Sequence, residues 1–205
     1  MAINKLVKKA VPDDVLQLLH KLMLDPVFDS FYLVGGTALA LQIGHRISID
    51  IDLFTGENFD TGQISECLCN AYAGKDIEIE QNTVRATIDK VKIDLMTHKY
   101  PLLEPLKEID AIRMANLKDI AAMKINAIAN RGSKKDFWDF ATLIDFFTAE
   151  DMLLFFQAKY ANANVWHAEK SLSYFDDAEA EPDPNDITGR TWKEIKLRIN
   201  NALKA

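Results

Sequence analysis

The sequence predicts an α+β fold, in which a small mixed β-sheet flanked by helices is followed by a helical C-terminal region. Two observations carry this prediction. Between residues 47 and 97, four stretches alternate apolar and polar side chains with a period of two, which is typical of strands. After about residue 110, apolar residues recur at helical spacing instead. We therefore expect an α/β core over residues 1–110 and a helical region over residues 111–205 packed on it.

The first elements alternate between helix and strand. Apolar residues at helical spacing predict a helix over residues 11–24, and the short apolar run 31–34 predicts a buried strand that ends at two glycines. The segment 37–43 is rich in Ala and Leu and predicts a second helix, which Gly44 ends. Residues 60–72 predict a third helix.

Four strands account for the rest of the first half. In residues 47–54, Ile47, Ile49, Ile51 and Leu53 are expected on one face, and the polar residues between them on the other. The stretches 76–81, 83–89 and 90–97 follow one another closely, so we expect antiparallel neighbours.

The second half contains five predicted helices and one loop. The helices are expected at 117–130, 134–147, 150–160, 165–175 and 192–203. The stretch before the last helix is acidic and contains prolines, which predicts a loop.

Composition and charge place the chain among globular proteins. It has 205 residues, 48% of them hydrophobic and 27% charged, so neither disorder nor a fibrous protein is indicated. The net charge of -7 arises from residues 176–189, which contain six acids and no base, so the remainder is nearly neutral. Cys67 and Cys69 are too close for an ordinary disulfide. Because no run reaches the ~18 apolar residues of a membrane span, we expect a cytoplasmic protein without membrane contact.

The glycine pair after the first predicted strand is a candidate phosphate site. Gly35, Gly36 and Thr37 lie where a strand runs into a helix. Glycines allow a ligand to approach the backbone closely, and the N–H groups and dipole of a helix start favour an anion. A plain tight turn would give the same pattern.

Two acids on the next predicted strand are candidate metal ligands. Asp50 and Asp52 are two residues apart, so both carboxylates project from one face, where they repel each other. A divalent cation would remove that repulsion, and oxygen ligands without His or Cys indicate Mg²⁺ or Mn²⁺. The alternative is an exposed sheet face on which both acids are solvated.

A third acid lies in a strand expected beside the first. Asp94 belongs to V-K-I-D-L-M, where Val91, Ile93 and Leu95 share the opposite face. An acid in the middle of a strand is uncommon unless it functions or is paired. Pairing with Lys92 or with an arginine is the alternative explanation.

These motifs resemble a known family of enzymes. A G-G turn, D-x-D and a later lone Asp match the nucleotidyltransferase fold, and G-G-T-A-L followed by H-R-I-S-I-D-I-D-L-F resembles the AbiEii/AbiGii bacterial nucleotidyltransferase toxins. The stretches D-I-A-A-M-K at 119–124 and K-K-D-F-W-D-F at 134–140 are similar to later family motifs. The resemblance spans about residues 31–145.

The resemblance implies a metal-dependent enzyme that moves an NMP from an NTP to an acceptor hydroxyl. It implies that the protein is the toxin of a toxin–antitoxin or phage-defence system, with a separately encoded antitoxin. The acceptor would be an RNA, such as tRNA, or a protein. Mg²⁺ or Mn²⁺ would be bound by the three acids, which with a lysine form the predicted catalytic set: Asp50, Asp52, Asp94 and Lys124. The predicted nucleotide-binding residues are Gly35, Gly36, Thr37, Arg46 and Asp136.

Simpler explanations exist for several of these residues. Asp119 and Asp136 each follow a potential N-cap by three residues, so helix capping alone would account for both. Lys124 could be a lysine at the rim of an apolar stripe, and Arg46 a surface arginine or a partner of one of the acids.

Two other functions fit the same motifs. One is a nucleotidyltransferase acting on a small molecule of the antibiotic type, since the acidic 176–189 segment suits a cationic substrate. The other is a non-catalytic binding protein on the same fold.

Overall fold

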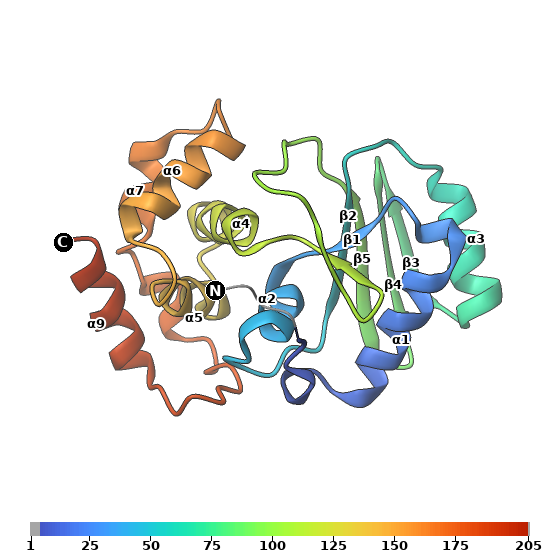
Figure 1. Cartoon of the computed structure of the whole chain (residues 1–205), viewed down its shortest axis with the longest axis horizontal. Coiled ribbons are helices and arrows are strands. Elements are labelled where there is room, and N and C mark those ends of the chain that lie inside the picture. Colours follow the sequence, from blue (N-terminus) through green and yellow to red (C-terminus); the bar gives the residue numbers. More distant parts are fainter. Residues whose placement is uncertain (1–4, 205) are drawn as a thin grey trace. The chain divides into compact units, whose positions relative to one another are not determined.

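A computed structural model describes residues 5–204 in two compact units (Figure 1). The ends of the predicted regions, residues 1–4 and 205, lie outside the described residues. Among the described residues, no helix is both long enough and apolar enough to cross a membrane. The first unit comprises Met1–Ile43, Ser48–Pro101 and Leu106–Ala115, and the second Gly44–Ile47, Leu102–Pro105 and Asn116–Ala205.

The first unit is built on a seven-stranded mixed sheet, which confirms the predicted α+β class. Its strands lie in the order β3-β4-β5-β2-β1-β7-β6. The β2–β5 and β1–β7 pairs are parallel and the other neighbours antiparallel, as expected for the β3–β4–β5 meander. The strands are β1 (Tyr32–Leu33), β2 (Ile51–Thr55), β3 (Lys75–Glu80), β4 (Thr83–Ile88), β5 (Val91–Thr97), β6 (Lys107–Ile109) and β7 (Ile112–Met114).

Three α-helices accompany this sheet. They are α1 (Asp13–Leu24), α2 (Gly35–Ile43) and α3 (Thr61–Tyr72), and short 3₁₀ turns lie at Lys8–Ala10 and Pro26–Phe28. Helix α3 packs on β3 and β4, α1 on β7, and α2 on β2 (Figure 1). Ile51 and Leu53 of β2 and Ile93 and Leu95 of β5 are fully buried, so one face of the central strands forms the core.

Arg113 on β7 fixes the segment that leads into β1. Its guanidinium donates to the backbone oxygens of Phe31, Met23 and Phe28, at 3.2, 2.9 and 3.1 Å. These carbonyls belong to the end of α1 and the turn after it, where a helix leaves carbonyl groups without intrahelical partners. The Arg113 guanidinium, bonded to these carbonyls, therefore fixes the segment that leads into β1, the strand before the Gly35 turn.

The predicted strand over residues 47–54 begins four residues late, at Ile51. Ser48 is buried and Ile49 is 57% exposed, which reverses the alternation expected for these positions. Two hydrogen bonds explain this reversal. The Ser48 hydroxyl accepts from Thr37 Oγ1 at 2.9 Å, and the backbone N–H of Ser48 donates to the Ala10 carbonyl at 3.0 Å. These bonds turn Ser48 inward and leave Ile49 outside.

The second unit is helical, as predicted. It contains α4 (Leu117–Asn130), α5 (Lys134–Leu143), α6 (Ala149–Lys159), α7 (Val165–Ser171), α8 (Asp176–Glu179) and α9 (Trp192–Ala202). Helices α5 and α7 end earlier than expected, because turns follow Leu143 and Ser171. Helix α8 lies inside the segment predicted to be a loop.

The change from sheet to helix lies slightly beyond the residue 110 suggested by the sequence. Strands β6 and β7 form an antiparallel hairpin, and Leu33 of β1 pairs with Met114 of β7. The first unit therefore runs to Ala115. Neither three-residue strand is long enough to produce a period-2 pattern.

Candidate active site

Two of the three acids predicted from the sequence lie side by side on adjacent central strands, and the third comes just before one of these strands. Asp52 of β2 is directly opposite Asp94 of β5 in the parallel register. Asp50 precedes Asp52 by two residues, just before β2 begins. Burial raises the pKa of the Asp94 carboxyl, the Arg85 guanidinium partly offsets this, and the negative charge of Asp50 raises the pKa again. The Asp94 carboxyl is therefore close enough to Asp50 for the charge of Asp50 to affect its pKa.

The glycine turn approaches these acids closely. Gly35 begins α2 with φ +68°, in the left-handed region that favours glycine. A Cβ atom at Gly35 would lie 2.5 Å from Asp52 Oδ2. Val34 N–H donates to the Asp52 carbonyl at 2.9 Å, so the turn and the strand are also joined through the backbone. The missing side chain at residue 35 thus makes room for the Asp52 carboxylate.

Thr37 contributes to the turn through a buried hydroxyl. Its Oγ1 donates to Ser48 Oγ and approaches the Asp50 carbonyl oxygen. The side chain therefore fixes the chain that carries the acids. Any contact of Thr37 with a phosphate would be made by its backbone N–H, because the first N–H groups of a helix have no intrahelical acceptor.

Replacement of Gly35 by alanine tests this close approach. The positive φ costs an alanine about 1–2 kcal/mol, and its methyl group forces the Asp52 carboxylate to rotate away. We expect Gly35→Ala to lower kcat/KM by more than its loss of stability explains. Gly189→Ala is the matched control, since Gly189 has φ +78° and nothing within 4 Å of the added Cβ. Equal effects of both variants on activity per folded molecule would contradict the proposed role of Gly35.

The donor set fits a hard divalent cation, although its groups are not already gathered around one point. Carboxylate oxygens from two adjacent strands are the ligands that Mg²⁺ and Mn²⁺ prefer. No three His, Cys, Asp or Glu side chains among residues 5–204 are arranged to hold a metal as they stand. Repulsion between like charges keeps neighbouring carboxylates apart when no cation is between them. Asp50, Asp52 and Asp94 thus form a candidate site that a cation would draw together.

Arg85 on β4 is a neighbour of this site that sequence reasoning missed. It lies opposite Asp94 in the antiparallel β4–β5 register, with its Nε 3.9 Å from Asp94 Oδ1. Its Nη1 donates to Glu80 Oε1 on β3 at 2.7 Å. The alternative explanation for Asp94, pairing with an arginine, is thus observed, although the two charged groups are at the long end of the ion-pair range. Arg85 could not be found from the sequence because its position opposite Asp94 depends on the β4–β5 register, which no local pattern reveals.

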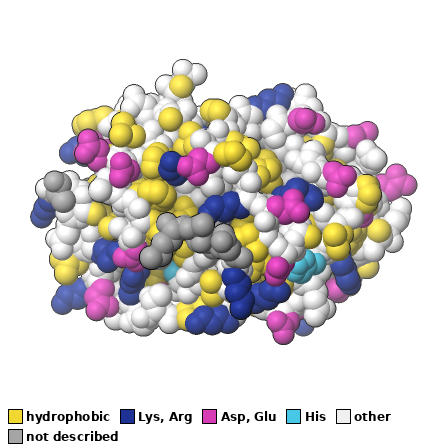
Figure 2. Space-filling model, in the orientation of Figure 1, with side chains coloured by type: hydrophobic (Ala, Val, Ile, Leu, Met, Phe, Trp, Pro, Cys, Tyr) yellow, Lys and Arg dark blue, Asp and Glu magenta, His cyan; other side chains and the backbone are white. Residues whose placement is uncertain are grey.

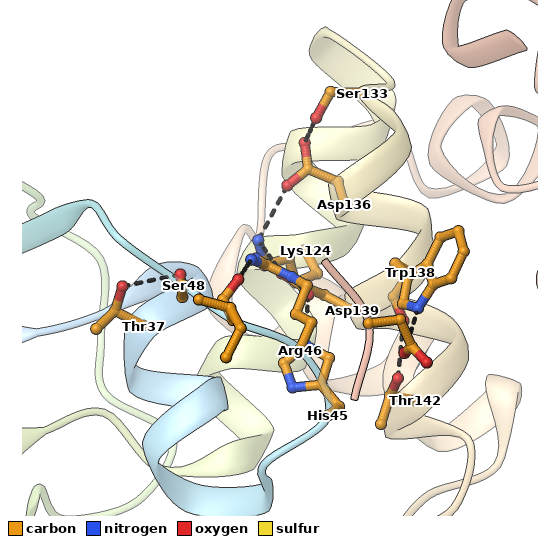
Figure 3. A network of polar contacts seen from close by, with 12 residues as sticks. Thr37, His45, Arg46, Ser48, Lys124, Ser133, Asp136, Trp138, Asp139 and Thr142 are labelled. Carbon is orange, nitrogen blue, oxygen red and sulfur yellow. Dashed lines mark hydrogen bonds and ion pairs between the residues drawn. The ribbon is translucent and has the colours of Figure 1, made fainter. Parts of the chain in front are cut away.

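In the second unit, Lys124 lies in a buried cluster of charges (Figure 3). Its Nζ is 2.9 Å from Asp136 Oδ1 and 2.7 Å from Asp139 Oδ2. Both carboxylates are fully buried, and Lys124 is 5% exposed. Despite burial, which disfavours the charged form, Asp139 and Asp136 hold the pKa of Lys124 above its ordinary value. This lysine is an internal counter-ion rather than a rim residue.

Arg46 joins the same cluster. Its Nε and Nη2 donate to the two oxygens of Asp139 at 2.6 and 3.0 Å, which is a bidentate pair. His45 Nε2 lies 2.6 Å from Asp139 Oδ1 (Figure 3). Asp139 therefore gathers three nitrogen-bearing side chains, although only its position in K-K-D-F-W-D-F marked it in the sequence.

Helix capping, the simpler explanation for Asp119 and Asp136, is observed at the start of α4 but not at the start of α5. Asn116 does cap α4, because its side chain accepts from the N–H groups of Lys118 and Asp119. Ser133 makes no such bond; its hydroxyl donates to Asp136 Oδ2 at 2.7 Å, and Arg131 Nε donates to the same oxygen at 2.8 Å. Asp136 is therefore the centre of an ion-pair network and not a capping residue.

Asp119 forms a second buried ion pair, with Lys159 of α6. The two side chains have no exposed surface, and Lys159 Nζ lies 2.6 Å from Asp119 Oδ1. The carboxylate also accepts from the backbone N–H groups of Leu103 and Glu104. Asp119 thus fixes the short segment Leu102–Pro105 within the second unit. Lys159 could not be found from the sequence because its partner lies 40 positions away.

The acidic segment after α7 binds its own unit. Glu179 accepts from Trp192 Nε1 at 2.8 Å and pairs with Lys196, while Lys134 Nζ lies 3.1 Å from Asp183 Oδ1. Asp186 accepts from Trp138 Nε1 at 2.9 Å. These carboxylates are structural anchors, so the segment offers less free negative charge to a cationic substrate than its composition suggested.

The Asp136–Asp139 cluster predicts a loss of stability in acid. Burial opposes ionisation, yet Lys124 and Arg131 hold the pKa of Asp136 below its ordinary value, and Arg46 and Lys124 do so for Asp139. A depressed folded pKa stabilises the fold above the unfolded value, ~3.9, and this contribution disappears as the pH falls through the folded value. We expect the urea midpoint to fall between pH 5 and pH 2. Asp139→Asn should have a lower midpoint at pH 7 and a shallower decline; an equal slope in both proteins would contradict this account.

Comparison with known proteins agrees with the family resemblance of the motifs. A family model described as nucleotidyl transferase AbiEii toxin, type IV TA system, matches residues 17–205. Uncharacterized protein aq_aa25 of Aquifex aeolicus (strain VF5) is 37% identical over 194 residues, which cover 92% of this chain and 93% of that one.

Two solved structures are similar in fold at low identity. MenT4, a nucleotidyltransferase toxin of Mycobacterium tuberculosis H37Rv, has a TM-score of 0.60 at 12% identity, covering 92% of this chain and 80% of its own. JHP933 from Helicobacter pylori has a TM-score of 0.56 at 18% identity, covering 95% and 92%. With the match over nearly the whole sequence, these findings identify the chain as a member of the AbiEii family of nucleotidyltransferase toxins.

Proposed function

We propose that this enzyme transfers an NMP from an NTP to an acceptor hydroxyl at the Asp50–Asp52–Asp94 face. Nucleotidyltransferases generally use an NTP and a divalent cation. The observation that carries the proposal is the register of Asp52 with Asp94, next to a glycine turn whose missing Cβ accommodates Asp52. Three carboxylates and a helix start in one unit supply both a cation site and an anion site.

In this proposal the three acids bind the cation, and one of them also accepts a proton. Asp50, Asp52 and Asp94 hold Mg²⁺ or Mn²⁺, which when bound stabilises the negative charge of the triphosphate oxygens. The acceptor hydroxyl oxygen forms a bond to the α-phosphorus, and the bond from that phosphorus to the pyrophosphate oxygen breaks. Asp94 accepts the hydroxyl proton.

The glycine turn is the proposed site of the β- and γ-phosphates. The backbone N–H groups of Gly35, Gly36 and Thr37 lie at the start of the nine-residue helix α2, whose dipole favours an anion. Positioning of the triphosphate and stabilisation of charge then supply most of the catalysis.

Lys124, Arg46 and Asp136, which the sequence predicts to contact the nucleotide, already have charged partners within the protein. Each of these side chains is buried, and each is bonded to a charged partner in the cluster around Asp139 or Asp136. A bound nucleotide would have to replace those partners. We therefore propose that Lys124, Arg46 and Asp136 mainly stabilise the second unit. Their direct contact with the nucleotide stays a prediction.

The acceptor is proposed to be an RNA, such as tRNA, or a protein. The type IV toxin–antitoxin assignment of the family implies an antitoxin. The face drawn in Figure 2 exposes both acidic and basic side chains, and several basic side chains gather in its lower middle part. A cationic small molecule receives little support, because Glu179 and Asp183 of the acidic segment are ion-paired.

Transfer of label to defined acceptors tests the proposal. The full chain is incubated with each α-labelled NTP, Mg²⁺ or Mn²⁺, and either total tRNA or a bacterial protein extract, with Asp52→Asn as control. We expect label on one macromolecular class, with a preference among the NTPs, and only with Asp52 intact. Absence of label on RNA and on protein, with a folded enzyme and bound NTP, would contradict the proposed acceptors.

A further inference from the structure

An aromatic side chain continues the acid-bearing face of the sheet. Residues two apart on a strand share a face, so Phe54 of β2 lies on the same side as Asp52, roughly 7 Å further along. Phe54 is directly opposite Met96 of β5, as Asp52 is opposite Asp94. The carboxylate pair is therefore followed on this face by an apolar pair.

Two more rings extend this apolar surface beyond the end of β5. His98 stacks on Phe54, with ring centroids 4.9 Å apart and an interplanar angle of 30°. Tyr100 lies against His98, with centroids 4.8 Å apart. His98 is held by its backbone N–H, which donates to the Thr55 carbonyl at 2.7 Å. The three rings form a series that begins beside the acids.

The last ring of the series is accessible. Tyr100 is 49% exposed, although its ring packs against that of His98. His98, which itself stacks on Phe54, packs against Tyr100 from one side, so the exposed part of Tyr100 offers an aromatic platform. Such a platform binds nucleobases by stacking, and it tolerates different bases because every base has a π-face.

We propose that Tyr100, supported by His98 and Phe54, is the surface on which the base of the bound NTP stacks. The inference rests on the proposed function, because it requires the triphosphate to lie at the glycine turn and the acids. It adds a base-binding subsite to a site otherwise made of carboxylates and backbone N–H groups. Stacking without base-edge hydrogen bonds from these rings predicts that the subsite itself discriminates only weakly between the four bases, so a preference among the NTPs must come from groups other than these rings.

Binding to the intact protein tests the subsite without relying on catalysis. Calorimetry with Mg²⁺ compares α,β-methylene NTPs, which resist transfer, with tripolyphosphate, which has no base. We expect Tyr100→Ala to raise the Kd of the nucleotide analogues by about 5- to 100-fold and to leave that of tripolyphosphate unchanged. Tyr100→Phe keeps the ring and should bind as the wild type does. Tyr174→Ala, at a tyrosine of similar exposure in the second unit, is the matched control.

The outcomes separate this inference from the function on which it rests. Unchanged nucleotide binding in Tyr100→Ala overturns the subsite while leaving nucleotidyl transfer intact. Equal weakening of nucleotide and tripolyphosphate also overturns it, because the substitution would then have disturbed the phosphate site. A wild-type protein that binds no nucleotide overturns the proposed function and the subsite together.

Discussion

Asp52→Asn is expected to abolish nucleotidyl transfer while leaving the fold intact. Asparagine has nearly the same shape as aspartate, but it cannot supply the negative charge that a divalent cation requires. Asp52 lies opposite Asp94 and against Gly35, so it is central to the proposed site. We expect kcat to fall by about a hundredfold or more, the scale of losing one strong electrostatic contact in a transition state.

The stability of the same variant distinguishes function from structure. Removing one charge from a group of three neighbouring acids relieves repulsion, so the melting temperature of the metal-free Asp52→Asn protein should be equal to or above that of the wild type. Asp29→Asn, at an exposed acid in the same unit, is the matched control and should change neither quantity. A variant that melts much earlier and loses activity only in proportion to folded protein would make Asp52 a structural residue.

Lys124→Met is expected to have the largest effect on stability. The substitution leaves Asp136 and Asp139 fully buried with one cation fewer between them. Breaking a buried ion pair by removing one partner costs about 3–5 kcal/mol, because the remaining charge is uncompensated. Urea unfolding followed by far-UV circular dichroism measures the loss.

An exposed lysine on the same helix provides the control for that measurement. Lys118 pairs with Glu104 at 2.5 Å, and both side chains are more than one-third exposed. Lys118→Met should therefore cost no more than ~1 kcal/mol. If Lys124→Met is as stable as Lys118→Met, the cluster does not stabilise the unit. A stable but inactive Lys124→Met protein would favour a direct role of the ammonium with the nucleotide.

The proposed metal site could be located from the sequence because its signals are local. A period-2 pattern places Asp50 and Asp52 on one face regardless of what surrounds the strand, and the same holds for Asp94. Two glycines between a strand and a helix are likewise visible without tertiary information. The pattern failed at Ser48 and Ile49, where the hydrogen bonds of Ser48 with Thr37 and with the Ala10 carbonyl override the alternation.

The surroundings of that site depend on contacts that the sequence does not contain. Arg85 meets Asp94 through the β4–β5 register, and Arg46 meets Asp139 across 93 positions of the chain. In the sequence, Lys124 lies on an apolar stripe of its helix, a position that fits a lysine at the rim of the core as well as one that contacts the nucleotide. Its burial is decided by the two acids of α5, so only the folded unit distinguishes an internal counter-ion from a phosphate ligand.

Comparison of α- and γ-labelled NTP is the most direct test of the central claim. With Mg²⁺ and the responsive acceptor, nucleotidyl transfer predicts that the α-label enters the acceptor while the γ-label leaves in pyrophosphate, in equal molar amounts. Both events should disappear in Asp52→Asn. Entry of the γ-label into the acceptor, or release of inorganic phosphate without pyrophosphate, would contradict nucleotidyl transfer at the Asp50–Asp52–Asp94 face.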